Sequence, residues 1–411
     1  MFRVFFVLLF LLSVSIFSKE VNKKSNEDIF KKADEIMLKI ASYGERKPNL
    51  TVKKALTSKK AVIEYLDSEI KNQYKENQFL AEEEVLKLMG LINEDVDYEK
   101  AIKSVLGQEV AGYYNPKNNT MYIADWLPMA QQEIVLAHEL FHAVQKQNYP
   151  AMEKMMAEDN SNPDKKLAVA SILEGEATAI MLDYEAVIKR KSSMSFDKIP
   201  GLEFIVNISM AMNPSKAFNK YSKYPQIMMS IMIFPYIRGL MFLKYFKAEG
   251  GWKAIDEIYK RLPVSTEQIL HVDKYLKNEL PKKIELKNKE KLLDGCKYIE
   301  KSMFGEAFLY TIFKNDMIDK TSVKDAEGWN GDRVFVYKCD NQYSAILITE
   351  WDSENDAKEF LKAIKFFLKE SLKGTNKLYS GKMKDKKVIV LLNTKRELTS
   401  KIYDLVVENT D

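Results

Sequence analysis

Several features are scarce in this sequence, and each absence narrows what the protein can do. Charge of one sign is not in excess, because 63 basic and 59 acidic residues are spread along the 411 positions. Nucleic-acid binding usually needs a clustered basic patch, so we expect no nucleic-acid partner. No internal repeat is found. Cysteine occurs only twice and histidine only three times, so any chemistry that needs them is confined to a few positions.

Long uninterrupted apolar runs are also rare. Residues 227–245 approach the length that spans a bilayer, but Pro235, Arg238 and Gly239 interrupt the run. We therefore expect a buried core helix in this segment, and no stable membrane span in the mature protein.

The amino-terminal residues form the other apolar stretch. A short charged head precedes fourteen apolar-rich residues that end at Phe17, which are too few to cross a bilayer comfortably. This pattern predicts a secretory signal over residues 1–18, cut near Ser15 or Ser18, and a retained anchor is the alternative. No cysteine lies near the cut, so a lipoprotein is not expected. The mature protein is expected to be exported, to the periplasm or the cell exterior.

The two cysteines, Cys296 and Cys339, both lie far downstream of the leader. In an exported protein two cysteines can pair and stabilise one domain. The sequence leaves this disulfide open, because it does not show whether the two Cβ atoms meet.

Two of the three histidines lie in one pentapeptide, His138-Glu139-Leu140-Phe141-His142. The surrounding residues 131–145 contain neither glycine nor proline and predict a helix. Positions i and i+4 share one face of a helix, so both imidazoles can bind one metal ion. Glu139 follows His138 and lies one position further round the helix, where its carboxylate can reach a water molecule bound to that ion. This spacing is typical of a zinc peptidase; two helix histidines bonded to polar neighbours in a core are the alternative.

A catalytic zinc site typically has a third protein ligand. His271 lies 129 residues after His142, so a third histidine close behind the motif is excluded and a carboxylate must serve. A helical pattern over residues 167–191 carries Glu174 and Glu176, which point about 200° apart. Glu174 has apolar neighbours on its own face, and a buried carboxylate needs a partner such as a metal. We choose Glu174 as the ligand and keep Glu176 as the alternative.

The chain is longer than one ordinary core, so two domains are expected after the leader. Residues 19–106 are charged and rich in helical patterns. Two short aromatic and β-branched runs, at 110–114 and 120–124, flank strong turn residues and predict a β-hairpin directly before the metal helix. Helices are expected to dominate from there to residue 262.

A polar stretch at 277–291 is typical of a linker. Beyond it, residues 333–337, 344–349 and 387–392 predict strands, and residues 356–372 predict an amphipathic helix between the last two. These elements favour a small α+β domain over residues 292–411.

The motifs together resemble the gluzincins, zinc metallopeptidases that take two histidines from the pentapeptide and a glutamate from a following helix. Glu174-Gly175-Glu176-Ala177 is similar to the Glu-Gly-x-Ala of aminopeptidase-N-like members, in which the first glutamate binds zinc. The resemblance covers about residues 85–275. It implies an α+β fold in which a mainly helical, zincin-like metallopeptidase domain with a small hairpin or sheet spans residues 107–283. Residues 19–106 would pack on that domain, and His138, His142 and Glu174 would hold Zn²⁺.

Two further residues are candidates for stabilising the oxyanion. Phe234–Gly239 is similar to a Pro-Tyr-Glu-Lys-Gly segment whose tyrosine steadies the oxyanion, which implies that role for Tyr236; a core tyrosine is the alternative. In thermolysin-like relatives a downstream histidine donates to the oxyanion, which implies the same role for His271; a structural histidine is the alternative. The exopeptidase segment Gly-x-Met-x-Asn does not precede the pentapeptide, so an endopeptidase is favoured.

The resulting expectation is an exported zinc endopeptidase that cleaves a peptide or protein substrate, with Glu139 as general base. An extended substrate is expected to pair with the strand at 121–124 or the strand at 110–114. The alternative is a non-catalytic envelope protein in which zinc only holds two helices together. Structural zinc sites usually have four protein ligands and favour cysteine, and both cysteines lie in the other predicted domain.

Overall fold

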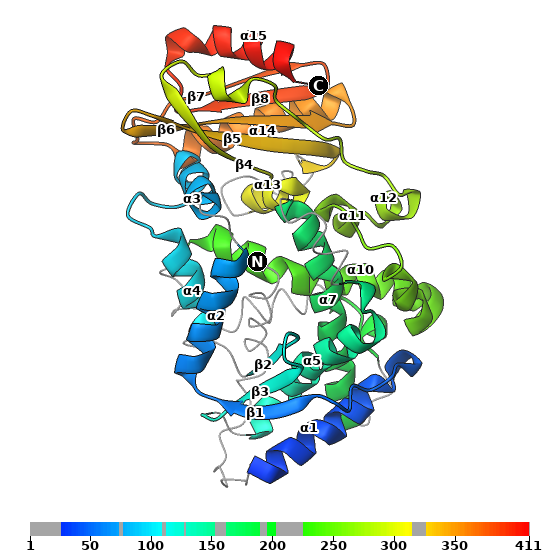
Figure 1. Ribbon diagram of the computed structural model, residues 1–411. Coiled ribbons are helices and arrows are strands. Elements are labelled where there is room, and N and C mark those ends of the chain that lie inside the picture. The colour runs from blue at the N-terminus through cyan, green and yellow to red at the C-terminus, as the bar shows by residue number, and fades with distance from the viewer. Residues whose placement is uncertain are drawn as a thin grey trace.

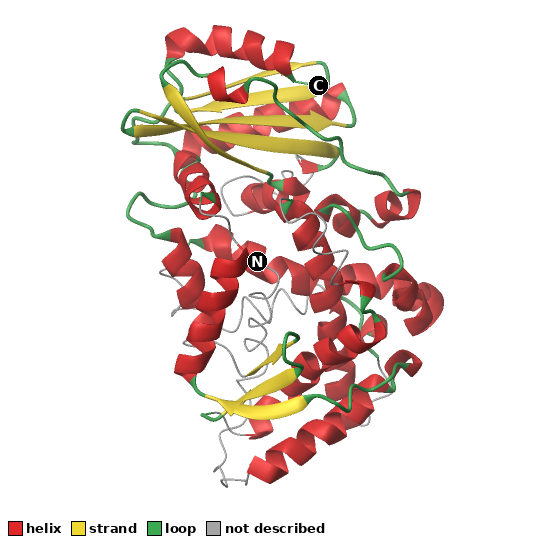
Figure 2. Ribbon diagram, in the orientation of Figure 1, coloured by secondary structure: helices red, strands yellow, loops and turns green. Residues whose placement is uncertain are grey.

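The computed structural model describes residues 26–73, 77–108, 112–126, 129–152, 162–189, 195–202, 225–314 and 326–410. Within these ranges the fold is α+β: helices and a small sheet form the amino-terminal part, and a larger sheet forms the carboxyl-terminal part (Figures 1 and 2). The predicted leader, residues 1–18, lies outside the described residues.

The first part of the chain consists mainly of helices of 11 residues or more. Its helices are α1 (Asn26–Ala41), α2 (Lys59–Gln73), α3 (Gln78–Leu88), α4 (Tyr98–Gln108), α5 (Met129–Asn148), α7 (Pro163–Asp183) and α10 (Gln226–Ile258), and the shorter α11 (Thr266–Leu270) and α12 (Val272–Lys277). Short 3₁₀ or π turns cover Tyr43–Glu45, Tyr184–Lys189, Phe196–Lys198, Lys289–Lys291 and Arg396–Leu398.

A three-stranded sheet lies beside helix α5, in the order β1-β3-β2. Strands β2 (Gly112–Asn115) and β3 (Thr120–Ala124) form the predicted hairpin, and β1 (Lys53–Thr57) runs parallel to β3 on its other side. Sequence patterns placed only helices around β1, because a five-residue strand that pairs far along the chain carries little local signal. Since β3 is paired on both sides, the expectation that residues 121–124 pair with a substrate is corrected. Among the described residues strand β2 is the edge of this sheet, on the side of α5.

Helices α7 and α10 cross in close contact at the centre of the molecule (Figure 1). The crossing point is a pair of glycines: a Cβ on Gly175 would lie 2.4 Å from the backbone carbonyl carbon of Gly239. A Cβ on Gly239 would in turn lie 1.8 Å from the backbone oxygen of Ser171. The two backbones therefore touch, which fixes the side chains that flank the glycines on both helices.

A second sheet forms the carboxyl-terminal part, with strands in the order β4-β5-β6-β8-β7, all antiparallel. Its elements are β4 (Cys296–Ser302), α13 (Gly305–Lys314), β5 (Trp329–Cys339), β6 (Gln342–Trp351), α14 (Glu354–Ser371), β7 (Tyr379–Lys384), β8 (Lys387–Leu392) and α15 (Thr399–Asn409). Apolar side chains alternate along the central strands, so Val334 and Val336 face one core while Phe335 and Tyr337 face another. Helix α14 covers the first face and α15 the second (Figure 1).

One hydrophobic core joins the two parts of the molecule. It runs from Val85 on α3 through Leu173 on α7 and Phe242 on α10 to Phe313 on α13 and Val390 on β8. Helix α3 also contacts β4, β5 and β6 directly. Helix α3 therefore packs against both the helical centre and the large sheet.

Helix α10 is, by length and composition, the one described helix that could cross a membrane. Its most apolar 18-residue window is 56% buried against the rest of the chain, and the core helix of a globular protein passes the same test. The expectation that the mature protein has no membrane span stays a prediction.

The two cysteines meet at the end of the β4–β5 pair. Cys296 and Cys339 are opposite each other in the strand register and form a disulfide bond. The bond closes a loop of the chain that contains β4, α13 and β5.

Candidate metal centre

Helix α5 carries the pentapeptide through the interior of the protein. His138, Glu139 and His142 are 1%, 2% and 4% exposed, so all three functional side chains are buried. At the start of this helix, Gln132 Nε2 donates to the backbone oxygen of Ala124 at 2.9 Å, which holds α5 against the hairpin. The two imidazole rings lie edge to face with centroids 4.9 Å apart, as expected for positions one turn apart.

Helix α7 brings Glu174 to both imidazoles. Glu174 Oε2 lies 3.1 Å from His138 Nε2 and 3.7 Å from His142 Nε2. One ligand atom from each of the three residues lies within 4.8 Å of the other two, and all three side chains are buried. The structure therefore assembles the three predicted ligands in one group that can bind a metal ion.

Glu176, the alternative ligand, points to the opposite side of α7. Its carboxylate forms a buried ion pair with Arg46, Oε1 to Nη2 2.5 Å, and accepts hydrogen bonds from Tyr259 and from Gln145. These three donors occupy the carboxylate away from the histidines. The 200° separation expected from helix geometry accounts for the different surroundings of the two glutamates.

Gln145 fixes the tautomer of His142. Its Nε2 donates to the backbone oxygen of Leu173 at 3.1 Å and to Glu176 Oε2 at 3.0 Å, so its Oε1 must be an acceptor. His142 Nδ1 lies 2.8 Å from that oxygen and therefore carries the proton. The lone pair of His142 is left on Nε2, the nitrogen that faces Glu174, which is the arrangement that a metal ligand requires.

Behind Gln145 lies a buried polar network that the sequence did not reveal. Arg46 pairs with Glu176 and also with Asp256, Nη2 to Oδ1 2.6 Å, and Tyr259 donates to Glu176. Gln145 is three positions after His142, so its place on the same helix face was available from spacing alone. Arg46 comes from the turn after α1, and no local pattern connects it with the motif. Its guanidinium is 2% exposed.

Burial sets the charge state of the two histidines. It lowers the pKa of His138 to about 3 and the pKa of His142 to about 4, so both imidazoles are neutral at ordinary pH. The neutral form is the one that binds metal ions. Burial also raises the pKa of Glu174, to about 7, and the charge of a bound cation would favour its ionised form.

One carboxylate oxygen of Glu139 lacks a hydrogen-bond partner among the described residues. The backbone N–H of Tyr114, on strand β2, donates to its carboxylate, while its buried Oε2 has no hydrogen-bond partner among the described residues. Burial, and then the charge of Glu174, raises the pKa of Glu139 well above its ordinary value. A buried oxygen of this kind calls for a polar partner beyond the described residues, such as a water molecule or an ion.

The donor set fits a zinc ion. Two neutral imidazole nitrogens and one carboxylate oxygen are the ligands of one known class of catalytic zinc site, which keeps its fourth position for water or substrate. The unsatisfied oxygen of Glu139 beside this set is an independent sign that a polar species belongs there. The residues present therefore fit zinc, with His138, His142 and Glu174 as the ligands.

Tyr236 lies at the site. Its ring is stacked near His138, with centroids 6.0 Å apart, and its hydroxyl donates to the carboxylate of Glu174. Tyr236 is one position after Pro235 and three before Gly239, so the close glycine crossing presses this turn of α10 against α7. Its position is compatible with the role that the sequence resemblance implied, and with a role in orienting Glu174.

The structure places His271 elsewhere. Its Nε2 lies 2.8 Å from Glu306 Oε1 on α13, and it is not part of the three-residue group. Helix α11, which ends just before His271, is anchored at the start of α7: the backbone N–H of Thr266 donates to the carboxylate of Asp164. Asp164 and Glu174 are about 15 Å apart along the helix axis. The geometry favours the structural alternative for His271, an ion pair that links α11 to α13.

Comparisons with protein families cover two segments of the chain. Residues 101–198, which include the pentapeptide and Glu174, match the IrrE N-terminal-like domain of the peptidase M78 family. This segment resembles a metallopeptidase. Residues 295–395 match a domain of unknown function, DUF8575, and each match covers about a quarter of the chain. No curated protein and no solved structure matches the chain.

Proposed function

We propose that this protein is a zinc-dependent peptidase of the gluzincin type, and that it cleaves peptide bonds within its substrate. The observation that carries the proposal is the convergence of His138, His142 and Glu174 on one buried point, with Glu139 close enough for the charge of Glu174 to act on it. The match of residues 101–198 to a peptidase family supports the same conclusion from an independent direction.

The chain's own residues supply binding, orientation and proton transfer. A bound zinc ion would supply Lewis-acid polarisation of the scissile carbonyl and of the attacking water. Glu139 takes the proton of that water on Oε2, the oxygen with no partner among the described residues, and then gives it to the leaving amine. The N–H of Tyr114 holds the other side of the Glu139 carboxylate in place.

Tyr236 is the proposed donor to the oxyanion of the tetrahedral intermediate. Its hydroxyl already lies within hydrogen-bond reach of Glu174, so it is close to the reaction centre. One well-aimed donor of this kind is worth about 3–4 kcal/mol in the transition state. Because His271 is paired with Glu306 on α13, it is not assigned this role.

The edge strand β2 is the proposed binding site for the substrate backbone. Strand β3 pairs with a strand on each side, whereas among the described residues β2 pairs with β3 only. The backbone of Tyr114 on this edge contacts Glu139, so a substrate strand added to β2 would pass the general base. Pairing along the main chain would fix the register of the scissile bond independently of side-chain sequence.

We further propose that the protein acts outside the cytoplasm. The apolar leader of residues 1–18 supports this, although it lies outside the described residues. The disulfide that joins Cys296 to Cys339 is a second support, because disulfides persist mainly in oxidising compartments. Sequencing of the amino terminus of protein from an extracytoplasmic fraction tests the proposal, and an uncut chain in the cytoplasm would contradict it.

The test of catalysis is a peptide-library digest with two matched variants. Glu139→Gln should keep close to one zinc per chain and lose cleavage, because it removes the proton acceptor but no ligand. Glu133→Gln is the control, since Glu133 lies on the same helix and contacts Lys32 and Tyr184 instead of the metal group. Unchanged cleavage by Glu139→Gln would remove the mechanism.

The second candidate is a non-catalytic protein in which the metallopeptidase fold has a structural or regulatory role. Such a protein would hold its metal with no position left for water. Among the described residues only three side chains converge on the site, which favours an open site over a closed one. Full retention of zinc without cleavage of any peptide in the library would favour this second candidate.

A further inference from the structure

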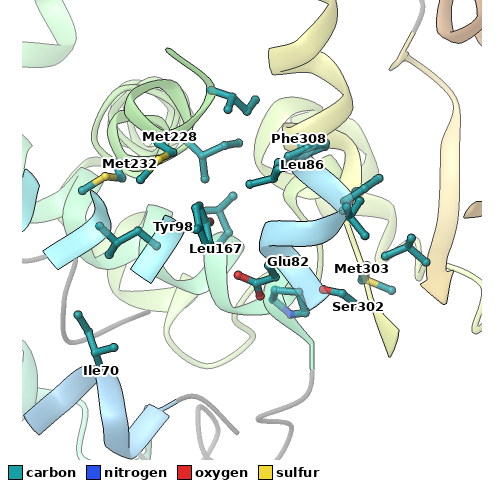
Figure 3. A pocket seen from close by; sticks show the side chains of 17 residues that line it. Ile70, Glu82, Leu86, Tyr98, Leu167, Met228, Met232, Ser302, Met303 and Phe308 are labelled. Carbon is teal, nitrogen blue, oxygen red and sulfur yellow. The ribbon is translucent and has the colours of Figure 1, made fainter. Parts of the chain in front are cut away.

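An apolar pocket lies between the amino-terminal helices and the large sheet. The space outside protein atoms in and around it, open solvent included, is about 1070 Å³. The pocket is bounded by α2, α3, α4, α7, α10, β4, β5 and α13. Figure 3 shows that its wall is mostly carbon and methionine sulfur, with Met228, Met232 and Met303 among the side chains that face the space. Methionine-rich surfaces adapt to apolar ligands of differing shape.

Two of the helices that line the pocket, α7 and α10, also carry residues of the candidate metal centre. On α7, Leu167 lines the pocket and Glu174 lies seven positions later, which is nearly the same helix face about 10 Å further on. On α10, Met232 lines the pocket and Tyr236 follows one turn later, about 6 Å along the axis. Both helices therefore lead from the pocket to the candidate metal centre within one or two turns.

One carboxylate interrupts the apolar wall. Glu82 on α3 faces the pocket among apolar side chains (Figure 3). In the described part of the chain it forms no ion pair, and its one side-chain hydrogen bond is long, 3.4 Å from Gln78 Nε2. Burial raises the pKa of Glu82 to about 7. A carboxylate held in this way is a natural partner for a cation that enters with a ligand.

We propose that this pocket binds the substrate of the peptidase, and that the substrate is a peptide segment with several bulky apolar side chains and one basic group. The apolar side chains occupy the space beside the methionines, and the basic group pairs with Glu82. The inference rests on the proposed function, because the pocket is assigned to substrate through its position one or two helical turns from the candidate metal centre.

Binding is measured separately from cleavage by using the Glu139→Gln variant of the full chain. Three labelled peptides of equal length are compared by fluorescence anisotropy: one with four Leu or Phe residues and a Lys, one with Glu in place of the Lys, and one with Ser in place of the apolar residues. The first should bind at least about tenfold more tightly than the second, because a charge-assisted hydrogen bond is lost. It should bind about 100-fold more tightly than the third, because buried apolar area is lost.

Pocket variants locate the binding site. Met228→Trp fills part of the space and should weaken binding of the first peptide about tenfold, while Met229→Trp, one position along and outside the pocket wall, should not. Glu82→Gln should remove the preference for Lys over Glu, and Glu84→Gln on the same helix should keep it. Circular dichroism and zinc content show that each variant is folded.

The results separate this inference from the proposed function. Binding that responds to Met228→Trp and Glu82→Gln, with no cleavage by the unaltered chain, would support the pocket and contradict peptidase activity. Cleavage that does not change in these variants, with equal binding of all three peptides, would keep the peptidase and overturn the pocket assignment.

Discussion

Replacement of Gln145 by leucine is predicted to weaken zinc binding without touching a ligand. The amide oxygen of Gln145 accepts the proton of His142 Nδ1 at 2.8 Å, and its Nε2 is committed to Leu173 and Glu176. Leucine has nearly the same volume but no polar atom. The imidazole would then lose the bond that fixes its tautomer and ring orientation, and Nδ1–H would be buried without a partner.

The expected loss of zinc affinity follows from other metal sites in which a residue hydrogen-bonds to a histidine ligand. Loss of a hydrogen bond that orients a histidine ligand typically costs 10–100-fold in metal affinity, which corresponds to about 1.4–2.7 kcal/mol. Stability should fall as well, because Glu176 loses one of its donors and a buried donor without a partner costs about 1–3 kcal/mol. Zinc affinity should therefore decrease more in Gln145→Leu than in a variant that only destabilises the fold.

The assay is competition for zinc between the protein and a chromophoric chelator at fixed pH. Gln132→Leu is the matched control, because Gln132 is equally buried on the same helix but donates to Ala124 instead of approaching a histidine. The control should lose stability and keep its zinc affinity. An affinity of Gln145→Leu within about threefold of the unaltered chain, with the fold intact, would refute the reasoning.

Three further predictions concern stability. Arg46→Met should lower the free energy of unfolding by about 3–5 kcal/mol in urea titration, because it leaves Glu176 buried without its cation; a loss below about 1 kcal/mol would contradict this. Gly239→Ala should cost more than the 1–3 kcal/mol typical of overpacking, measured in the same way, because its Cβ would meet a backbone oxygen of α7. Burial raises the pKa of Asp164 to about 8, above the value near 3.9 of an unfolded chain, so the stability that its proton contributes is present below pH 4 and is lost as pH rises towards 8. Asp164→Asn should flatten the pH dependence of stability in that window, and an unchanged slope would show that Asp164 is not its source.

The metal centre could be predicted largely from the sequence because its signals are local. The pentapeptide defines two ligands by helix periodicity, and the contrast between Glu174 and Glu176 follows from the rotation between neighbouring positions. The hairpin at β2 and β3 and the helix α14 were likewise evident from short-range patterns. The identity of the third ligand also needed the apolar neighbours of Glu174, which indicated that its face is buried.

What the sequence did not predict depends on contacts between distant segments. Strand β1 exists because Lys53–Thr57 pairs with β3, and nothing within those five residues requires a strand. Arg46 donates to Glu176 in the network beside Gln145, and these two residues are 130 positions apart in the sequence. His271 was a candidate only because histidines are rare, and its partner Glu306 lies on a helix that sequence patterns had not identified.

The ion pair between Arg46 and Glu176 limits how short a fragment that keeps the peptidase-like segment can be. The segment that resembles a peptidase begins at residue 101, but the cation that neutralises its buried Glu176 is supplied 55 positions earlier. Strand β1, which flanks the hairpin, comes from the same upstream region. An excised fragment that starts at the family boundary would carry every candidate ligand and yet lack the counter-charge of Glu176, which bonds the Gln145 that orients His142. The minimal autonomous unit must therefore start before Arg46.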